Sequence, residues 1–334
     1  EIYTLSLHDA LPILSEFYLC TLVEAFQTVV PPVVIRRLIK PVRKSSRQRS
    51  RAGLEGLGEA TRNHTLNEEQ LRALDGLLSR AGTSLLEGIT GSGKTEVYLA
   101  AIEHFLAKGR GAIVLVPEVS LTPQAIDRYR GRLGENVAVL HSRLSDAERA
   151  HQWRLVQTGE ARVALGTRSA IFAPVQDLGL IIIDEEHDSS YKQDNAPRYH
   201  ARQVAAWRAA RHSGCRLVLG SATPCLESYT YARLGQFGHW TMSQRATEQR
   251  LPSVEMLDLR KYRLRSGEDL SAPLVSALEV ALSKGQQAVL LYNRRGFSRY
   301  LQCQDCGEVT HCRHCSIAMT VHHSPRRLLC HYCG

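Results

Sequence analysis

The chain has 334 residues, enough for two domains with hydrophobic cores, and its 43% hydrophobic and 22% charged residues are typical of a soluble globular protein. No run of about 18 apolar residues is present, so we predict no membrane span. The apolar start is broken by Asp9, Glu16 and Glu24 and lacks a basic leader, which makes it a poor signal peptide. We therefore expect a cytoplasmic protein without a membrane partner.

The formal net charge of +9 is distributed unevenly. Eight Lys or Arg residues and no acidic residue lie between Arg36 and Arg51, both included. Such a run attracts the phosphates of nucleic acids through counterion release, but it is equally typical of a solvated linker. The charge pattern favours a polyanionic partner without establishing one.

The first part of the chain is a mixture of segments. Residues 1–14 match nothing that follows, so we expect a foreign or artefactual segment. Residues 15–64 combine an apolar stretch, a Pro-Pro pair and the basic run, which indicates the tail of another domain and a linker. Because the sequence starts without Met and stops one residue after a cysteine pair, we expect it to be a fragment.

From residue 65 onward, short apolar runs alternate with amphipathic stretches. The runs at residues 84–87, 112–116, 137–140, 163–165, 180–183 and 217–219 are predicted to be buried parallel strands. Tyr98, Ala101, Ile102, Phe105 and Leu106 recur at helical spacing and predict one apolar helix face. This alternation predicts an α/β fold with a doubly wound parallel sheet, in which ligands bind at the carboxyl ends of the strands.

After Pro252 the pattern weakens. We predict a strand at residues 254–257, an amphipathic helix at 272–282 and a stronger strand at 288–292. The last strand leads into a cluster of cysteines.

Residues 88–95 read Gly-Ile-Thr-Gly-Ser-Gly-Lys-Thr, the phosphate-binding P-loop pattern between a strand and a helix. The glycines let backbone N–H groups turn toward phosphates, and the helix N-terminus adds partial positive charge. Lys94 is expected to reach the β- and γ-phosphates of ATP and Thr95 to ligate Mg²⁺. A simple helix-capping turn fits this context less well. The predicted nucleotide-binding residues of the loop are Gly88, Ile89, Thr90, Gly91, Ser92, Gly93, Lys94 and Thr95.

Two carboxylates, Asp184 and Glu185, follow the predicted strand at 180–183. A P-loop protein needs one carboxylate to hold Mg²⁺ and one to orient and deprotonate the attacking water. We assign Asp184 to the metal and Glu185 to the water, so that Lys94, Asp184 and Glu185 are the predicted catalytic residues. In isolation the same residues could form an acidic loop after a core strand.

Several motifs resemble those of superfamily 2 helicases, and the longer ones resemble the PriA family of replication-restart helicases. The pattern Asp-Glu-x-His at 184–187 and Gly-Ser-Ala-Thr-Pro at 220–224 point to the superfamily. The stretches that resemble PriA are residues 115–124 (LVPEVSLTPQ), 166–170 (GTRSA), 184–193 (DEEHDSSYKQ), 197–202 (PRYHAR) and 293–297 (NRRGF). They cover residues 65–334 in the family's order.

The resemblance implies an ATP-dependent helicase that moves 3′-to-5′ on DNA at stalled replication forks and assembles the primosome. Forked DNA, single-stranded DNA-binding protein and other primosome proteins are the implied partners. It divides the chain into a remnant of the N-terminal DNA-binding region (15–64), a RecA-like first ATP-binding lobe (65–245), the start of a second lobe (246–300) and a truncated zinc region (301–334). Because most of the second lobe, with its arginine finger, is missing, we expect weak nucleotide binding and no unwinding by this chain.

The resemblance also assigns residues to DNA contact or to coupling between ATP hydrolysis and movement. They are Arg168, Ser169, His187, Tyr191, Lys192, Arg198, Tyr199, Ser221 and Thr223. Aromatic faces stack on bases, and Lys or Arg holds phosphates. For the two tyrosines, ordinary core packing is an equally good interpretation.

Gln70 has two interpretations. It resembles the glutamine that recognises adenine ahead of the P-loop in the family, and the P-loop follows at the expected distance. Alternatively, Asn67 and Gln70 form a capping box at a helix N-terminus. We favour adenine recognition slightly.

Six of the nine cysteines form three Cys-x-x-Cys pairs in the last 32 residues: Cys303, Cys306, Cys312, Cys315, Cys330 and Cys333. Two such pairs make a tetrahedral Cys₄ zinc site, and the clustering of three pairs argues against a redox function. In the PriA family four pairs nest around two zinc ions. By that pattern Cys312, Cys315, Cys330 and Cys333 complete one site, while Cys303 and Cys306 lack partners.

Two further hypotheses compete with the helicase. One is a zinc-dependent module that docks DNA or primosome proteins and uses its ATPase as a switch. The other is a different superfamily 2 motor, such as a recombination or restriction translocase, which the segment 191–202 and the cysteine pairs argue against. Only the replication-restart helicase accounts for every motif.

Overall fold

The computed structural model divides into two compact units, Glu1–Gln249 and Arg250–Gly334. It describes residues 13–14, 18, 20–30, 65–246, 253–258, 261–262, 270–291, 303, 306, 308–323 and 326–333. The predicted basic run lies outside these residues. In the described part of the chain, no helix is both long and apolar enough to cross a membrane.

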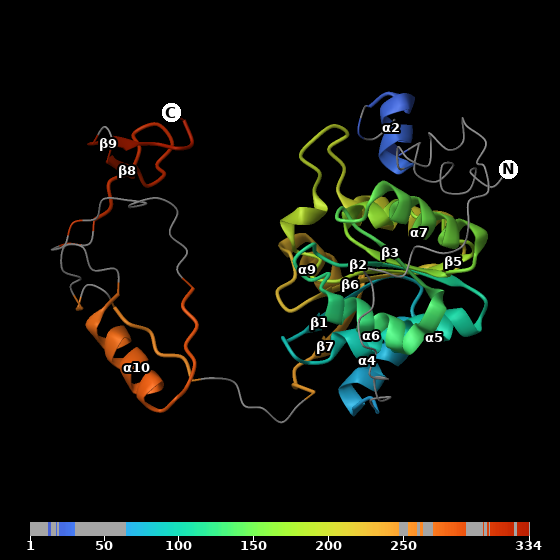
Figure 1. Cartoon of the computed structure of the whole chain (residues 1–334), viewed down its shortest axis with the longest axis horizontal. Coiled ribbons are helices and arrows are strands. Elements are labelled where there is room, and N and C mark those ends of the chain that lie inside the picture. Colours follow the sequence, from blue (N-terminus) through green and yellow to red (C-terminus); the bar gives the residue numbers. More distant parts are fainter. Residues whose placement is uncertain are drawn as a thin grey trace. The chain divides into compact units, whose positions relative to one another are not determined.

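The first unit is built on a seven-stranded sheet whose strands are all parallel (Figure 1). The strands are β1 (Gly82–Gly88), β2 (Gly111–Leu115), β3 (Val137–Leu140), β4 (Val163–Gly166), β5 (Leu178–Ile183), β6 (Arg216–Ser221) and β7 (Gly238–Met242). Their order in the sheet is β3-β4-β2-β5-β6-β1-β7. The six predicted strands are confirmed as β1 to β6, and with them the doubly wound α/β fold. The edge strand β7 was missed.

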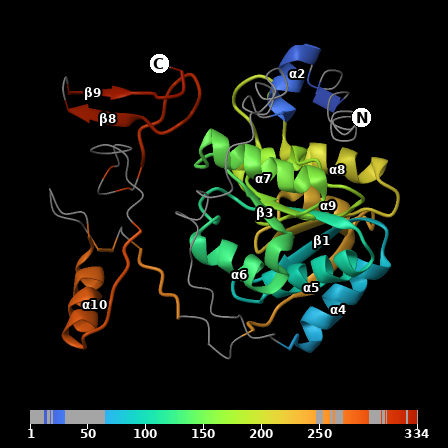
Figure 2. The same cartoon turned by 45° about the vertical axis from the view of Figure 1, so that its right-hand side comes forward.

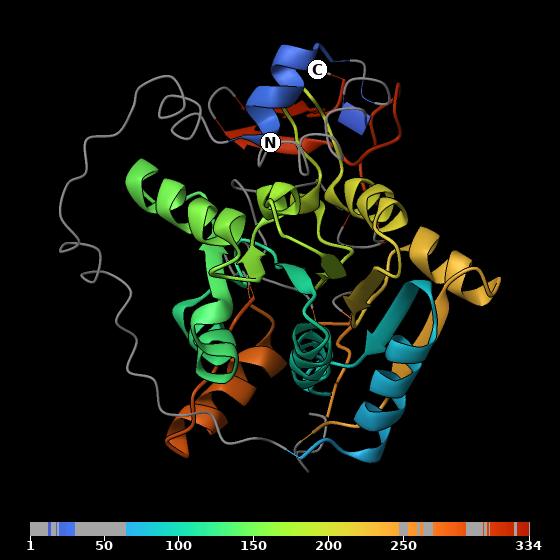
Figure 3. The same cartoon turned by 90° about the vertical axis from the view of Figure 1, so that its right-hand side faces the viewer.

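Helices cover both faces of the sheet because successive strand residues point to opposite sides. The helices α4 (Glu68–Ser79), α5 (Lys94–Ala107) and α6 (Pro123–Leu133) pack on the face that carries Ala112 and Val114. On the other face, α7 (Asp146–Thr158), α8 (Ala201–Arg211) and α9 (Leu226–Arg233) pack against Ile113 and Leu115. Figures 1 and 2 show α7 opposite α5 and α6, and α5 is seen almost end-on in Figure 3. Two hydrophobic cores therefore sandwich the sheet.

The N-terminal segment joins the core on the α7 side. Val29 and Val30, at the end of α2 (Leu22–Val29), are buried in that cluster. Ile13 and Leu14 are buried there as well, although they belong to the segment predicted to be foreign. Since residues 1–12 lie outside the described residues, the origin of residues 1–14 stays a prediction.

The second unit contains the helix α10 (Ala272–Ser283) and a hairpin of β8 (Thr320–His323) and β9 (Arg326–Leu329). The predicted helix at 272–282 is confirmed. The strand predictions at 254–257 and 288–291 are wrong, since both segments lack strand structure and Met256 and Val289 are 92% and 96% exposed; Tyr292 lies outside the described residues. A strand needs the backbone of a neighbour for its hydrogen bonds, and no described strand pairs with either segment.

Candidate nucleotide-binding site and metal centre

The P-loop connects β1 to α5 in the geometry that a phosphate-binding loop requires. Gly91 and Gly93 have φ angles of +82° and +85°, in the left-handed region that favours glycine. A Cβ atom on Gly93 would lie 2.3 Å from Nε2 of Gln70, so this position has no room for a side chain. Lys94 opens α5, is 9% exposed, and its Nζ donates to the carbonyl oxygen of Gly88 at 2.8 Å.

A cavity of about 510 Å³ opens at this loop. It is lined by Thr65, Asn67, Gln70, Ile89, Thr90, Gly91, Ser92, Gly93, Lys94, Thr95, Glu96, Arg128, Asp184, Glu185 and Ala246. Of the residues predicted to bind nucleotide, Gly88 alone does not line the cavity, and its carbonyl holds Lys94 instead.

The residues after β7 complete one wall of the cavity. The backbone N–H of Ala246 donates to the carbonyl oxygen of Gly91 at 2.9 Å. Two to three residues earlier in this segment, Ser243 Oγ and the N–H of Gln244 donate to the Glu69 carboxylate at 2.7 and 3.0 Å. The segment that follows β7 therefore contacts first α4 and then the P-loop.

Lys94 and the acidic motif meet at the same edge of the sheet. β1 and β5 are parallel and are separated by β6 alone, so both carboxyl ends open into the cavity. Lys94 Nζ lies 3.8 Å from Glu185 Oε1. Lys94, Asp184 and Glu185 therefore line one cavity, as expected for residues at the carboxyl ends of parallel strands.

Asp184 is held by two buried tyrosines. Its Oδ1 accepts a hydrogen bond from the Tyr98 hydroxyl at 2.9 Å, and its carbonyl oxygen accepts one from the Tyr191 hydroxyl at 2.6 Å. Burial, with the negative charge of Glu185 beside it, raises the pKa of the Asp184 carboxyl. A divalent cation would offset that cost, and Mg²⁺ takes oxygen ligands such as those of Asp184 and Thr95, so the residues fit this ion.

Glu185 adopts an unusual backbone conformation. Its φ of 45° lies in the left-handed region, which a non-glycine residue rarely occupies and which is concentrated at functional sites. This turn places its carboxylate between two groups, with Oε1 3.8 Å from Lys94 Nζ and Oε2 3.7 Å from His187 Nδ1.

Three of the residues predicted to contact DNA or to couple hydrolysis to movement lie together: His187, Ser221 and Thr223. Ser221 Oγ accepts a hydrogen bond from the N–H of Thr223 at 2.9 Å and lies 2.8 Å from Nδ1 of His187. Ser221 is fully buried at the end of β6. The acidic motif and the Ser-Ala-Thr turn are therefore in direct contact.

Sequence reasoning missed Glu186. Its buried carboxylate accepts hydrogen bonds from Arg202 Nη1 at 2.6 Å, from the N–H of Cys225 at 2.7 Å and from Ser228 Oγ at 3.0 Å. These partners belong to the start of α8 and the start of α9. The sequence contains this glutamate and the arginine that ends the 197–202 motif, but nothing in it pairs the two residues.

The loop between β5 and α8 does not present its tyrosines to solvent. Tyr191 and Tyr199 are 0% and 1% exposed, and the Tyr199 ring packs edge-on against Phe172 at 5.0 Å between centroids. The prediction that these rings stack on DNA bases is wrong for this conformation, because core packing, the alternative interpretation, occupies their faces. Lys192 and Arg198 are exposed.

Arg168 donates hydrogen bonds to the backbone of this loop. Its Nη1 donates to the carbonyl oxygens of Ser190 at 3.0 Å and Lys192 at 2.6 Å, and its guanidinium lies over the Tyr199 ring at 5.9 Å. Its guanidinium is thus partly used within the protein, whereas the neighbouring Ser169 is exposed.

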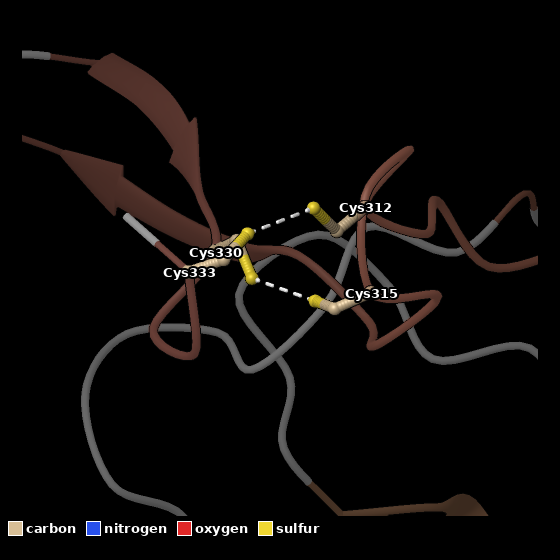
Figure 4. A group of neighbouring side chains, drawn as sticks. All are labelled: Cys312, Cys315, Cys330 and Cys333. Carbon is tan, nitrogen blue, oxygen red and sulfur yellow. Dashed lines mark hydrogen bonds between the residues drawn. The ribbon is translucent and has the colours of Figure 1, made fainter.

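Four cysteines form a compact cluster in the second unit (Figure 4). The Sγ atoms of Cys312, Cys315, Cys330 and Cys333 all lie within 4.8 Å of one another. Tetrahedral zinc with bonds of about 2.3 Å separates its sulfurs by roughly 3.8 Å, so the cluster fits zinc. The backbone N–H groups of Cys333 and Tyr332 direct hydrogen bonds at Cys330 and lower its pKa to about 6, which favours the thiolate that metals bind.

These are the four cysteines predicted to complete one site. Cys303 and Cys306 are exposed, and no group of three or more metal-ligating side chains among the described residues includes them. His311, adjacent to the cluster, places Nδ1 2.8 Å from the Ser316 carbonyl oxygen. A metal at Cys303 and Cys306 stays a prediction.

Comparison with known proteins places these features in a family. Residues 67–230 match the model of the DEAD/DEAH box helicases, and residues 312–334 match that of the Cys-rich region domain of PriA DNA helicases. The replication restart protein PriA of Bacillus subtilis is 53% identical over 252 residues, which are 75% of this chain and 31% of that protein. PriA of Treponema pallidum is 41% identical over 323 residues, 96% of this chain and 47% of that protein.

Among solved structures, RecG bound to a three-way DNA junction aligns with 56% of this chain and 25% of its own at 25% identity, with a TM-score of 0.41. The sheet, the P-loop cavity and the acidic motif define a RecA-like helicase domain of the DEAD/DEAH box class. A zinc-ribbon region follows it. The chain belongs to the PriA family of replication restart proteins, and it spans between about a third and a half of the length of the curated relatives it matches.

Proposed function

We propose that this chain carries the ATP-hydrolysing site of a DNA helicase of replication restart, which moves 3′-to-5′ along DNA and assembles the primosome at stalled forks. The observation that carries the proposal is the meeting of Lys94, Asp184 and Glu185 in one cavity of a PriA-family chain. Forked DNA, single-stranded DNA-binding protein and other primosome proteins are the proposed partners, and the bacterial cytoplasm is the proposed location.

The P-loop would hold the phosphates of ATP. Lys94 would exchange its present acceptor, the Gly88 carbonyl, for β- and γ-phosphate oxygens, while the N–H groups of the loop and the N-terminus of α5 surround them. Thr95 and Asp184 would hold Mg²⁺, which when bound neutralises charge on the phosphates. The Tyr98 hydroxyl holds Oδ1 of Asp184 in place.

Glu185 is the proposed group that orients the attacking water and accepts its proton. The left-handed turn aims its carboxylate into the cavity, and Lys94 and His187 bracket it. A positioned base of this kind contributes about 10²–10⁴ to a rate.

His187 would pass the state of this site to the Ser221–Thr223 turn, because its ring nitrogen meets the Ser221 hydroxyl. The loop that Arg168 supports lies next to the same motif, through the Tyr191 hydrogen bond to Asp184. Ser169, Lys192 and Arg198 are exposed and are the proposed contacts to the phosphates of DNA.

Titration of this chain with a fluorescent ATP analogue and Mg²⁺ tests the nucleotide site. We expect Lys94→Ala to weaken binding about 10- to 100-fold, as loss of a hydrogen bond to a charged group does. Glu185→Gln should retain binding and lower ATP turnover in the presence of DNA. Lys108→Ala removes the same charge from an exposed position at the end of α5 and should change neither. Equal binding by wild type and Lys94→Ala would contradict the proposal.

A second candidate function is a zinc-dependent docking module with a switch-like ATPase, which the complete Cys₄ cluster favours. It predicts binding to forked DNA that survives Lys94→Ala but is lost on zinc chelation. The helicase proposal instead predicts that DNA stimulates ATP turnover and that Lys94→Ala abolishes the stimulation.

Gln70 has the predicted capping role, and its side chain also lines the cavity. Its Oε1 and the Asn67 side chain form the capping box of α4, while its Nε2 donates to the Ser92 carbonyl oxygen at 3.0 Å. Adenine recognition stays a proposal, since the amide lines the cavity. Gln70→Glu keeps the capping acceptor and removes the donor, so we expect an intact helix by circular dichroism but reduced preference for ATP over GTP; unchanged preference would leave Gln70 with the capping role alone.

A further inference from the structure

The cavity walls contain a second cation besides Lys94. Arg128 lies on α6, the helix that packs beside α5 (Figure 2). The wall also carries three carboxylates, Glu96, Asp184 and Glu185. A nucleoside triphosphate brings further negative charge, and the only cationic side chains that line the described cavity to meet it are Lys94 and Arg128.

Arg128 is held only loosely in this structure. Its Nε lies 3.8 Å from Glu96 Oε1, beyond hydrogen-bond distance, and its side chain is 49% exposed. An ion pair whose cation is exposed and makes no hydrogen bond contributes little to stability, so little energy keeps the guanidinium at Glu96.

Arg132 explains why Glu96 holds Arg128 weakly. It lies one helical turn after Arg128 on the same face of α6. Its Nη1 donates to Glu96 Oε2 at 2.8 Å, and its Nε and Nη2 donate to the two carboxylate oxygens of Glu103, each at 2.8 Å. Glu96 therefore has a hydrogen-bonded cationic partner without Arg128, and the donors of Arg128 remain available.

The position of Glu96 points to the ligand of Arg128. Glu96 follows Lys94 and Thr95 in the first turn of α5, whose backbone N–H groups face the phosphate site. Because Arg128 and Glu96 both line the cavity, an arginine side chain that leaves Glu96 can reach a triphosphate bound there. Its planar fork of donors matches two phosphate oxygens.

We propose that Arg128 is a nucleotide-binding residue, which leaves Glu96 and pairs with a phosphate group of bound ATP. This rests on the proposed ATP site and adds a residue of the first unit to it. Glu96 then serves as the counter-ion that retains the guanidinium near the cavity when no nucleotide is bound. Arg128→Lys should restore binding only partly, since an ammonium does not match two oxygens at once.

Binding of a fluorescent ATP analogue to this chain tests the inference. We expect Arg128→Ala to weaken binding about 10-fold or more, and Arg130→Ala, which removes the same charge from α6 outside the cavity, to leave it unchanged. If Lys94→Ala weakens binding and Arg128→Ala does not, the inference fails while the ATP site stands. If the wild-type chain binds no nucleotide, the ATP site fails as well.

A second measurement needs no variant. Phenylglyoxal modifies accessible guanidinium groups, and mass spectrometry reports the extent at each arginine. We expect Mg-ATP to protect Arg128 and to leave Arg130 unprotected, whereas adenosine, which has no phosphate, should protect neither. Equal modification of Arg128 with and without Mg-ATP would overturn the inference.

Discussion

The carboxylate of Glu186 and the guanidinium of Arg202 form an ion pair with a separation of 2.6 Å, and the Glu186 side chain is 0% exposed. Burial alone would raise the pKa of Glu186, but the hydrogen bonds from the Cys225 N–H and from Arg202 outweigh it and lower the pKa. The pair joins the acidic motif after β5 to the first residues of α8 and α9. It thereby fixes three segments that surround the site.

Replacing Glu186 should be strongly destabilising. Glu186→Ala leaves Arg202, the Cys225 N–H and the Ser228 hydroxyl without their acceptor. Breaking a buried pair in this way costs about 3–5 kcal/mol, and because Arg202 is 22% exposed we expect about 3 kcal/mol in urea denaturation. Glu135→Ala, at an exposed position before β3, should change the unfolding free energy by less than about 0.5 kcal/mol. Similar losses of unfolding free energy in both variants would show that the buried ion pair contributes no more to stability than an exposed glutamate.

Stability should fall on acidification because of His200. Burial, followed by the charges of Arg202 and Lys192, lowers the pKa of His200 from 6.5 to about 4. Between these two values the unfolded chain binds a proton that the folded chain does not, so stability decreases as the pH falls from 6.5 to 4 and this contribution is complete below 4. His200→Asn keeps a side-chain cap for α8 and should lose less stability than wild type between pH 7 and 4.5 in denaturant titrations.

The matched control for His200 is His151, which is exposed on α7. His151→Asn should show the same pH dependence as wild type. A wild-type dependence in His200→Asn would mean that other groups cause the acid sensitivity.

Gly220 must lack a side chain for Tyr98 to reach Asp184. A Cβ atom at residue 220 would lie 1.7 Å from the Tyr98 hydroxyl oxygen. Gly220→Ala should therefore cost about 1–3 kcal/mol of stability, as overpacking does, and should weaken Mg²⁺-dependent nucleotide binding. In the Tyr98→Phe background the nearest atom is gone, so the same substitution should cost less in thermal unfolding; equal costs in both backgrounds would argue against this clash.

Zinc content should separate the cysteine pairs. Cys315→Ser removes one of four converging sulfurs, so we expect loss of zinc by plasma mass spectrometry and loss of protection of the β8–β9 hairpin in hydrogen exchange. Cys303→Ser should retain about one zinc ion per chain. Zinc retention in the first variant, or loss in the second, would contradict the assignment of the site.

The parts of the fold that were predicted correctly are those whose signal is local. Five of the six predicted strands are apolar throughout, and the sixth, at 84–87, has two leucines at its centre. Such runs arise because a parallel strand inside a doubly wound sheet is buried on both faces. The edge strand β7, with half-buried His239 and Trp240 and exposed Thr241, has no such run. The segment 288–291 has the run, but no strand among the described residues pairs with it, so its apolar composition was not enough to predict a strand.

The site was predictable as far as its motifs are contiguous. The loop of residues 88–95 and the Asp184–Glu185 pair carry their chemistry within a few residues, and their meeting follows from strands that run parallel. Tyr191 and Tyr199 lie in a polar stretch of sequence that does not indicate burial. They are buried because Tyr191 bonds to Asp184 and Tyr199 packs against Phe172. The Glu186 contacts span up to 42 positions, and a single sequence does not reveal which glutamate turns inward.

The hydrogen bond from Ala246 to Gly91 gives the segment that follows β7 a place in the nucleotide site. The wall that Ala246 contributes depends on a main-chain amide, so most side chains at this position would preserve it and proline, which has no N–H, would not.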